Sequence, residues 1–98
     1  MNRTDKLIVE YLNASFGENP TFNTSVSRIL NPYTFNTDKR TRFELNGQFF
    51  CHVTDGRPGI SFCSTLLKTI NSLFDANQFD SNRILEDWFH EKTPKVNY

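Results

Sequence analysis

The stretch 40-RTRFELNGQFFCHVTDGRPGISFCSTLLKTINSLF-74 decides the fold of this 98-residue chain. Asn46 and Gly47 lie near its start, and both residue types tolerate the positive φ angles that a type I′ turn requires. Aromatic and β-branched residues on both sides of this pair predict two antiparallel strands joined by a tight turn. The turn sets the register of the hairpin, and the register determines which side chains share a face of the sheet.

A two-residue turn at this position predicts two different faces for the hairpin. The pairs on the first face are Leu45 with Gln48, Phe43 with Phe50, and Thr41 with His52. The pairs on the second face are Glu44 with Phe49, Arg42 with Cys51, and Arg40 with Val53. We expect the first, mostly apolar face to meet the core and the second to be half covered or used for contact with a partner.

The loop after the hairpin leads into a predicted amphipathic helix. Two glycines and a proline within residues 55–59 are typical of turns. Apolar residues then recur at helical spacing and are expected to pack on the face that carries Phe43, Leu45 and Phe50. The members of this stripe are Phe62, Cys63, Leu66, Leu67, Ile70, Leu73 and Phe74.

The part of the chain before the hairpin is predicted to hold two helices. Thr4 begins the first, an apolar face recurs up to Phe16, and Gly17 suits the position after a helix. Residues 18–39 contain the pair Asn-Pro twice, which favours turns. Between these two turns, residues 25–30 are expected to form a short helix.

The last helix is predicted to begin at Asp80, with Phe79 packing on Ile84. Pro94 ends it, and residues 93–98 are expected to form a flexible tail. The predicted fold class is therefore a small single α+β domain over residues 1–98. It consists of an N-terminal helix and an antiparallel hairpin of two or three strands that packs against two C-terminal helices.

Composition and charge narrow the classes of function. Eleven Lys and Arg balance eleven Asp and Glu, so the chain lacks the long-range field that steers proteins to nucleic acid or anionic membranes. No run of 18 apolar residues predicts a membrane span, and the first residues do not resemble a signal peptide. Two cysteines are too few for a disulfide framework, which favours a cytoplasmic protein.

Catalytic and metal-binding chemistry find little support in the sequence. The Cys and His residues lack the paired spacing of two to four residues that structural zinc sites use, so we expect no metal or other cofactor. They are Cys51, His52, Cys63 and His90. The acidic residues of the last third lie at helical spacing, as on a solvated face. With no catalytic motif, we expect a protein that is not an enzyme.

The leading hypothesis is a small binding protein that occupies the surface of a partner protein. Exposed aromatic residues and arginines are the usual anchors of interfaces, and the second face of the hairpin with the following loop supplies both. The predicted partner-binding residues are Arg40, Arg42, Glu44, Phe49 and Arg57. Further aromatic residues exceed what the core obviously needs: Phe22, Tyr33, Phe35, Phe79 and Tyr98.

Two further expectations concern the partner. The free edge of the hairpin offers a strand for pairing, including pairing with a second copy as a homodimer. Eleven Asn and ten Phe against two Ala indicate an AT-rich gene. Such genomes are common among phages and low-GC bacteria, and with the size of the chain this favours a phage or mobile-element protein that inhibits or modulates a host or defence factor.

The alternative hypothesis is a small nucleic-acid-binding regulator with a basic hairpin rim. Its predicted contact residues are Lys39, Arg40, Arg42 and Arg57. The helix expected to open at residues 59–61 would add free N–H groups for a phosphate. Asp38, Glu44 and Asp55 interleave with these cations and weaken the argument.

Overall fold

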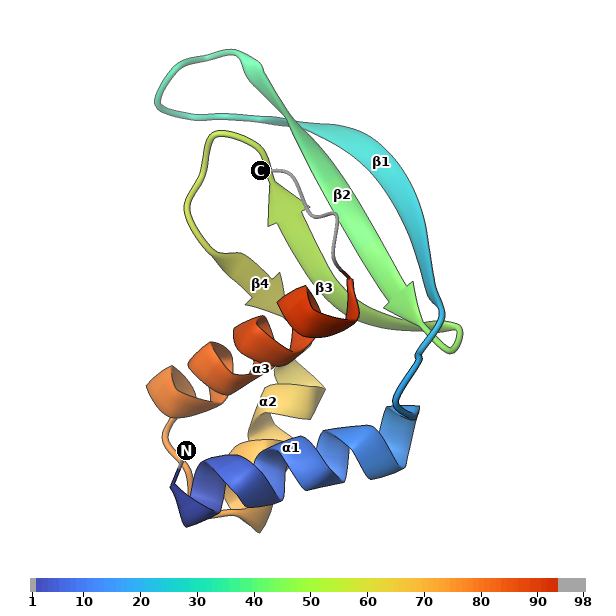
Figure 1. The fold of residues 1–98 in the computed structure, drawn as a ribbon. Helices are drawn as coiled ribbons and strands as arrows, with labels where there is room; N and C mark the ends of the chain where they lie inside the picture. Colours follow the sequence, from blue (N-terminus) through green and yellow to red (C-terminus); the bar gives the residue numbers. More distant parts are fainter. Residues whose placement is uncertain (1, 94–98) are drawn as a thin grey trace.

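The hairpin predicted around Asn46 and Gly47 forms the centre of a larger antiparallel sheet (Figure 1). The structure is a computed structural model that describes residues 2–93. The four strands lie in chain order: β1 Phe22–Leu30, β2 Thr37–Leu45, β3 Gln48–Thr54 and β4 Ile60–Phe62. The helices are α1 Arg3–Phe16, α2 Ser64–Leu73 and α3 Gln78–Lys92. The α+β class is confirmed, with four strands in place of two or three.

Strand β1 corrects the prediction of a short helix over residues 25–30. All nine of its residues pair with β2, from Phe22 opposite Leu45 to Leu30 opposite Thr37. Nucleation of a helix is unfavourable, and a six-residue helix forms too few hydrogen bonds to offset it. Pairing with β2 instead gives the segment a continuous ladder of backbone hydrogen bonds. The β-branched and hydroxyl side chains of this segment also favour a pleated strand over a helix.

A β-bulge moves part of the hairpin out of its predicted register. The two pairs next to the turn form as expected, but Phe43 then faces Cys51, and Arg42 faces His52. Phe50 is the extra residue on β3, and an extra residue lets two successive side chains turn toward the same face. The alternation of residue types alone does not predict such a bulge.

The bulge exchanges residues between the two faces of the sheet. Cys51 and Val53, expected on the second face, are buried in the core, and His52 lies on the opposite face. Burial raises the pKa of the Cys51 thiol to about 12. This cysteine is therefore a small core residue that stays protonated at neutral pH.

A short fourth strand occupies the place where the sequence predicts the start of a helix. Ile60 and Ser61 pair with Val53 and His52 of β3, and the backbone N–H of Cys63 donates to the carbonyl of Phe50. Helix α2 consequently begins at Ser64. The helix N-terminus expected over residues 59–61, and with it the predicted phosphate contact, is absent.

Helix α3 covers the sheet, and α2 does not pack as predicted. The Phe89 ring lies at the centre of the core, and it contacts the rings of Phe22, Phe43, Phe50 and Phe62 edge-on or stacked. Because β4 carries the chain along the sheet, α2 begins beside the sheet and packs mainly against α3. Of the predicted α2 stripe, Ile70 is buried, whereas Leu73 is exposed.

The helix ends differ from their predictions by a few residues. Asn2 caps α1 by accepting from the Asp5 N–H, and Asn77 caps α3 by accepting from the Asp80 N–H. Phe79 is exposed, so it does not form the expected contact with Ile84. Thr93 ends α3, while Pro94 and the remainder of the predicted tail lie outside the described residues.

Within residues 2–93, no helix has the length and hydropathy of a membrane span.

Candidate partner-binding surfaces

The face of the sheet opposite the core brings together four of the five predicted partner-binding residues. We call it the outer face and define it by Arg40, Arg42, Glu44, Phe49 and His52. The first three alternate with core-facing residues along β2. Phe49 faces Glu44 across the hairpin, and the bulge places His52 beside them.

The side chains of the outer face form a packed group. The Arg42 guanidinium lies 4.4 Å from the centre of the Phe49 ring, a cation–π distance. Phe49 also contacts His52, whose ring centre is 4.5 Å from the Phe49 ring centre. Arg42 Nε also donates to Glu44 at 3.2 Å. Much of the cationic and aromatic character of this face is therefore already used in internal contacts.

The surroundings of His52 lower its pKa, which favours the neutral imidazole. Burial lowers its pKa first, and the positive charges of Arg40 and Arg42 lower it further. The Nε of Arg40 is buried and has no hydrogen-bond partner among the described residues. Two guanidinium groups beside the Phe49 ring suit a carboxylate or phosphate of a ligand.

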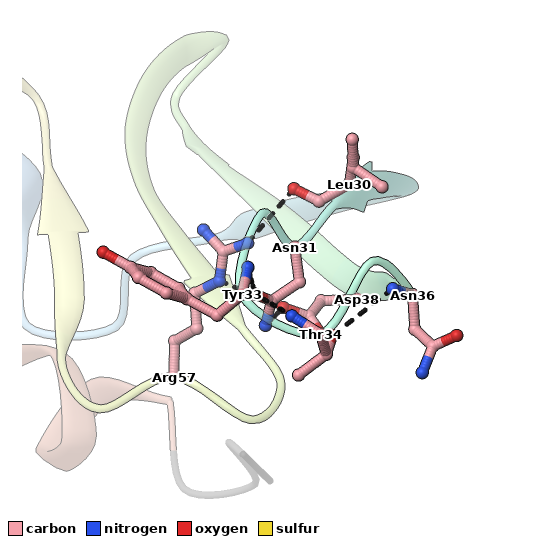
Figure 2. A network of polar contacts seen from close by, with 7 residues as sticks. All are labelled: Leu30, Asn31, Tyr33, Thr34, Asn36, Asp38 and Arg57. Carbon is pink, nitrogen blue, oxygen red and sulfur yellow. Dashed lines mark hydrogen bonds and ion pairs between the residues drawn. The ribbon is translucent and has the colours of Figure 1, made fainter.

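Arg57, the fifth predicted partner-binding residue, lies where β1 and β2 meet their connecting loop (Figure 2). It extends from the β3–β4 loop to the adjoining ends of the two strands, where its Nε donates to Asp38 Oδ2 at 3.0 Å and its Nη2 to the Leu30 carbonyl at 3.3 Å. Alternation along β2 puts Lys39 on the face opposite Asp38 and Arg40. The structure thus separates Lys39 from the other residues of the predicted basic rim and pairs Arg57 with Asp38.

The β1–β2 connection, residues 31–36, is a loop held by one asparagine side chain. We call it the tip loop. Asn31 Oδ1 accepts from the N–H groups of Tyr33 at 2.9 Å and Thr34 at 3.4 Å, and Asn31 Nδ2 donates to Asp38 Oδ2 at 3.0 Å (Figure 2). Asn31 is itself buried. Its amide therefore joins the loop to the same carboxylate that binds Arg57.

Backbone contacts close the tip loop further. Asn31 N–H donates to the Asn36 carbonyl at 2.8 Å, and Phe35 N–H donates to the Asn31 carbonyl at 2.9 Å. Phe35 has a φ of 60°, a conformation that few aromatic residues adopt. Such backbone strain persists only where the surroundings fix it, and it concentrates at binding sites.

The tip loop directs two aromatic side chains into solvent. Tyr33 is 91% exposed and Phe35 is 81% exposed. Both belong to the surplus aromatic residues of the sequence, and neither is among the predicted partner-binding residues. The contact that holds the loop, Asn31 with Asp38, forms because β1 pairs with β2. The sequence does not predict that pairing, so it does not identify the loop as a site. Phe22 of the same set packs in the core, Phe79 is exposed, and Tyr98 lies outside the described residues.

A small pocket and a larger open groove lie on the described part of the chain. A pocket of about 200 Å³ lies among α1, α2 and the hairpin turn, below the usual size of ligand pockets. An open groove of about 570 Å³ follows β4 and contains Arg57 and His52 on its rim. Within the described residues, no group of three or more His, Cys, Asp or Glu side chains is placed to hold a metal ion.

The chain was compared with family models, curated proteins and solved structures. No family model, no curated protein and no solved structure matches the chain.

Proposed function

We propose that this chain is a non-catalytic binding protein that attaches to a partner protein through its tip loop. The observation that carries the proposal is the pair of exposed aromatic side chains, Tyr33 and Phe35, on a backbone fixed by buried and ion-paired polar groups. Large apolar side chains in water reduce solubility, and a single surface aromatic is common. Two on one constrained loop favour a role in recognition.

The tip loop has the properties of an interface hot spot. Tyrosine is enriched among the residues that dominate binding energy. Binding also costs the entropy of ordering loops, and a loop already held in place reduces that cost. Asn31, Asp38 and Arg57 supply this order, since together they fix both ends of the loop. Their polar groups act as scaffold, and the aromatic rings remain available to a partner.

The charge around the tip loop indicates the chemistry of the partner. Arg28 and Lys39 lie opposite each other near the end of the ribbon, and both are exposed. Asp38 is neutralised by Arg57. A partner with an apolar pocket for the aromatic rings and acidic residues around it would complement this end. We propose inhibition or modulation of a host or defence factor by a phage or mobile element as the specific role, on the composition alone.

Replacing Tyr33 and Phe35 by alanine is expected to abolish partner capture and leave the fold intact. A hot-spot aromatic contributes about 2 kcal/mol or more, so the double variant should bind at least 100-fold more weakly. The measurement is quantitative pull-down from lysate of the cells in which the protein acts, followed by titration of the recovered partner. Phe79→Ala is the matched control because Phe79 is similarly exposed but lies on α3. Equal capture by the double variant and by the control would contradict the proposal.

A second candidate function, nucleic-acid binding, is favoured by the outer face. The Arg40 and Arg42 guanidinium groups and the Phe49 ring offer phosphate donors and an aromatic surface. The pairing of Arg42 with Glu44 and of Arg57 with Asp38 partly neutralises two of the four predicted contact residues. We therefore place it second.

The double variant Arg40→Ala/Arg42→Ala tests this second function. If the outer face binds single-stranded nucleic acid, affinity should fall steeply with salt, and the double variant should reduce the log–log salt slope by about 1.4 for two phosphate contacts. Fluorescence anisotropy of labelled RNA and DNA oligonucleotides measures it, with Lys68→Ala on α2 as the control. Absence of binding by the wild-type chain at low salt would exclude this function.

A further inference from the structure

Strand β1 is a long open edge of the sheet. β2 pairs with one side of it, and no described element pairs with the other (Figure 1). Open edges are normally protected by short length, prolines or several charges. The opposite edge, β4, is short at three residues, but β1 has nine residues, no proline and Arg28 as its one charge. The protein thus leaves one edge unprotected.

Two exposed apolar side chains of β1 lie on the same face of the sheet as the core. Val26 is 61% exposed and Leu30 is 63% exposed. Alternation puts them on the face of Phe22, which packs against Phe89. The part of β1 that leads to the tip loop extends beyond the region of the sheet that the helices cover (Figure 1).

We propose that a second copy of this chain pairs with β1 in antiparallel orientation about a two-fold axis at Val26. This register sets Val26 opposite Val26 of the second copy, and Leu30 opposite its Phe22. The Leu30–Phe22 and Val26–Val26 pairs then alternate along this face with the pairs of the two polar residues that lie between them. Arg28 falls opposite Thr24, so that the one charged residue of the strand does not face itself. The interface is isologous, as closed two-fold dimers require.

The backbone geometry fits this register. Asn31 N–H donates to Asn36 across the ribbon, so the polar groups of Asn31 point toward β2. Antiparallel ladders alternate, and the groups of Leu30, Arg28 and Val26 therefore point to the free edge. A two-fold axis at Val26 pairs each residue whose backbone groups point to the free edge with another residue of that kind. The two sheets would join into one of eight strands.

The charge distribution favours this orientation of the second copy. Residues 20–62, which include the whole sheet, hold five basic and three acidic residues, a net charge of +2. The remainder of the chain, which includes all three helices, holds six basic and eight acidic residues, a net charge of −2. β1 runs from the helical end to the tip loop (Figure 1). Antiparallel pairing consequently places the basic end of each copy beside the acidic end of the other.

The expected dimer is weak, because the contact is a narrow strip. Nine residues of strand extend over about 30 Å, and one strand pair buries less than a standard interface of about 800 Å² per partner. We expect dissociation in the micromolar range. The dimer is formed by β1 and not by the aromatic side chains of the tip loop, so it does not depend on the proposed function.

Val26→Lys is expected to weaken self-association at least 10-fold. The variant sets two lysines opposite each other at the axis, where like charges oppose pairing. Sedimentation velocity between about 1 and about 500 µM measures the monomer–dimer equilibrium. Val26→Thr, which keeps β-propensity and charge, is the control and should dimerise like the wild type. Thermal melting should show that both variants fold, because Val26 is exposed.

Cross-linking tests the register. Oxidation of Val26→Cys should join two copies covalently, because directly opposite residues lie within disulfide distance. Ser27→Cys should not cross-link, because Ser25 of the second copy faces it. Peptide mapping distinguishes the introduced thiols from Cys63. A wild-type chain that stays monomeric over the whole range overturns the proposal, as does a dimer that Val26→Lys leaves unchanged or that cross-links through Ser27→Cys.

Discussion

Phe89→Ala is expected to lower the free energy of unfolding by about 3–5 kcal/mol. The Phe89 side chain is 0% exposed, and its ring lies between α3 and the sheet. It contacts one phenylalanine on each strand, namely Phe22, Phe43, Phe50 and Phe62. Removal of this ring leaves a cavity on which all four strands border. The loss is a large fraction of the about 5–15 kcal/mol that stabilises a typical domain.

Phe79→Ala is the control for this experiment, because Phe79 lies on the same helix and is 77% exposed. Its effect on stability should stay within about 0.5 kcal/mol. Urea unfolding followed by tryptophan fluorescence reports on the core directly, because Trp88 is buried beside Phe50. Equal and small effects of the two variants would show that α3 does not hold the sheet as described.

Ile70→Asp is expected to prevent folding at physiological temperature. Ile70 is 0% exposed on the buried side of α2, and an aspartate there would place a carboxylate among apolar side chains. Burying an unpaired charge costs more than a domain of this size can lose. Circular dichroism and a urea titration would show a chain without a cooperative transition.

Leu73→Asp on the same helix is the matched control, because Leu73 is 60% exposed. The aspartate would remain in water, so the change in stability should be below about 1 kcal/mol. Together the two variants test whether the predicted stripe is buried at Ile70 and exposed at Leu73. Unfolding by Leu73→Asp as well would mean that this end of α2 is covered, for example by another molecule.

Local signals account for the parts of the fold that could be predicted from the sequence. The Asn46–Gly47 turn permits few alternatives, and its first pair, Leu45 with Gln48, forms as expected. Gly17 follows α1 directly. The apolar residues at helical spacing on α3, including Trp88 and Phe89, are buried. In each case the residues that decide the structure are within one or two turns of chain.

The elements that were predicted wrongly from the sequence depend on residues that are distant in the chain. β1 is a strand because β2 pairs with all of it, and residues 25–30 by themselves also fit a short helix. The bulge at Phe50 exists because Phe50 and Cys51 both have room in the core, which α3 helps to form. β4 forms on the free side of β3. A short window of sequence does not contain the pairing and packing partners on which these structures depend.

The candidate site shows the same division. Alternation along β2 was enough to place Arg40, Arg42 and Glu44 on one face. The ion pair of Arg57 with Asp38, 19 residues apart, follows from the way the β3–β4 loop passes the β1–β2 loop. That contact converts Arg57 from an expected partner-binding residue into a support of the tip loop.

The sequence by itself determined the α+β class, the central hairpin, the two long helices and the residue types that a partner can meet. Only the tertiary structure decided which aromatic residues fill the core and which point into solvent from the tip loop. It also decided that β1 becomes an open edge. The physical reason is that periodicity and turn chemistry act over a few residues, whereas burial, register and ion pairing arise when segments far apart in the chain come into contact.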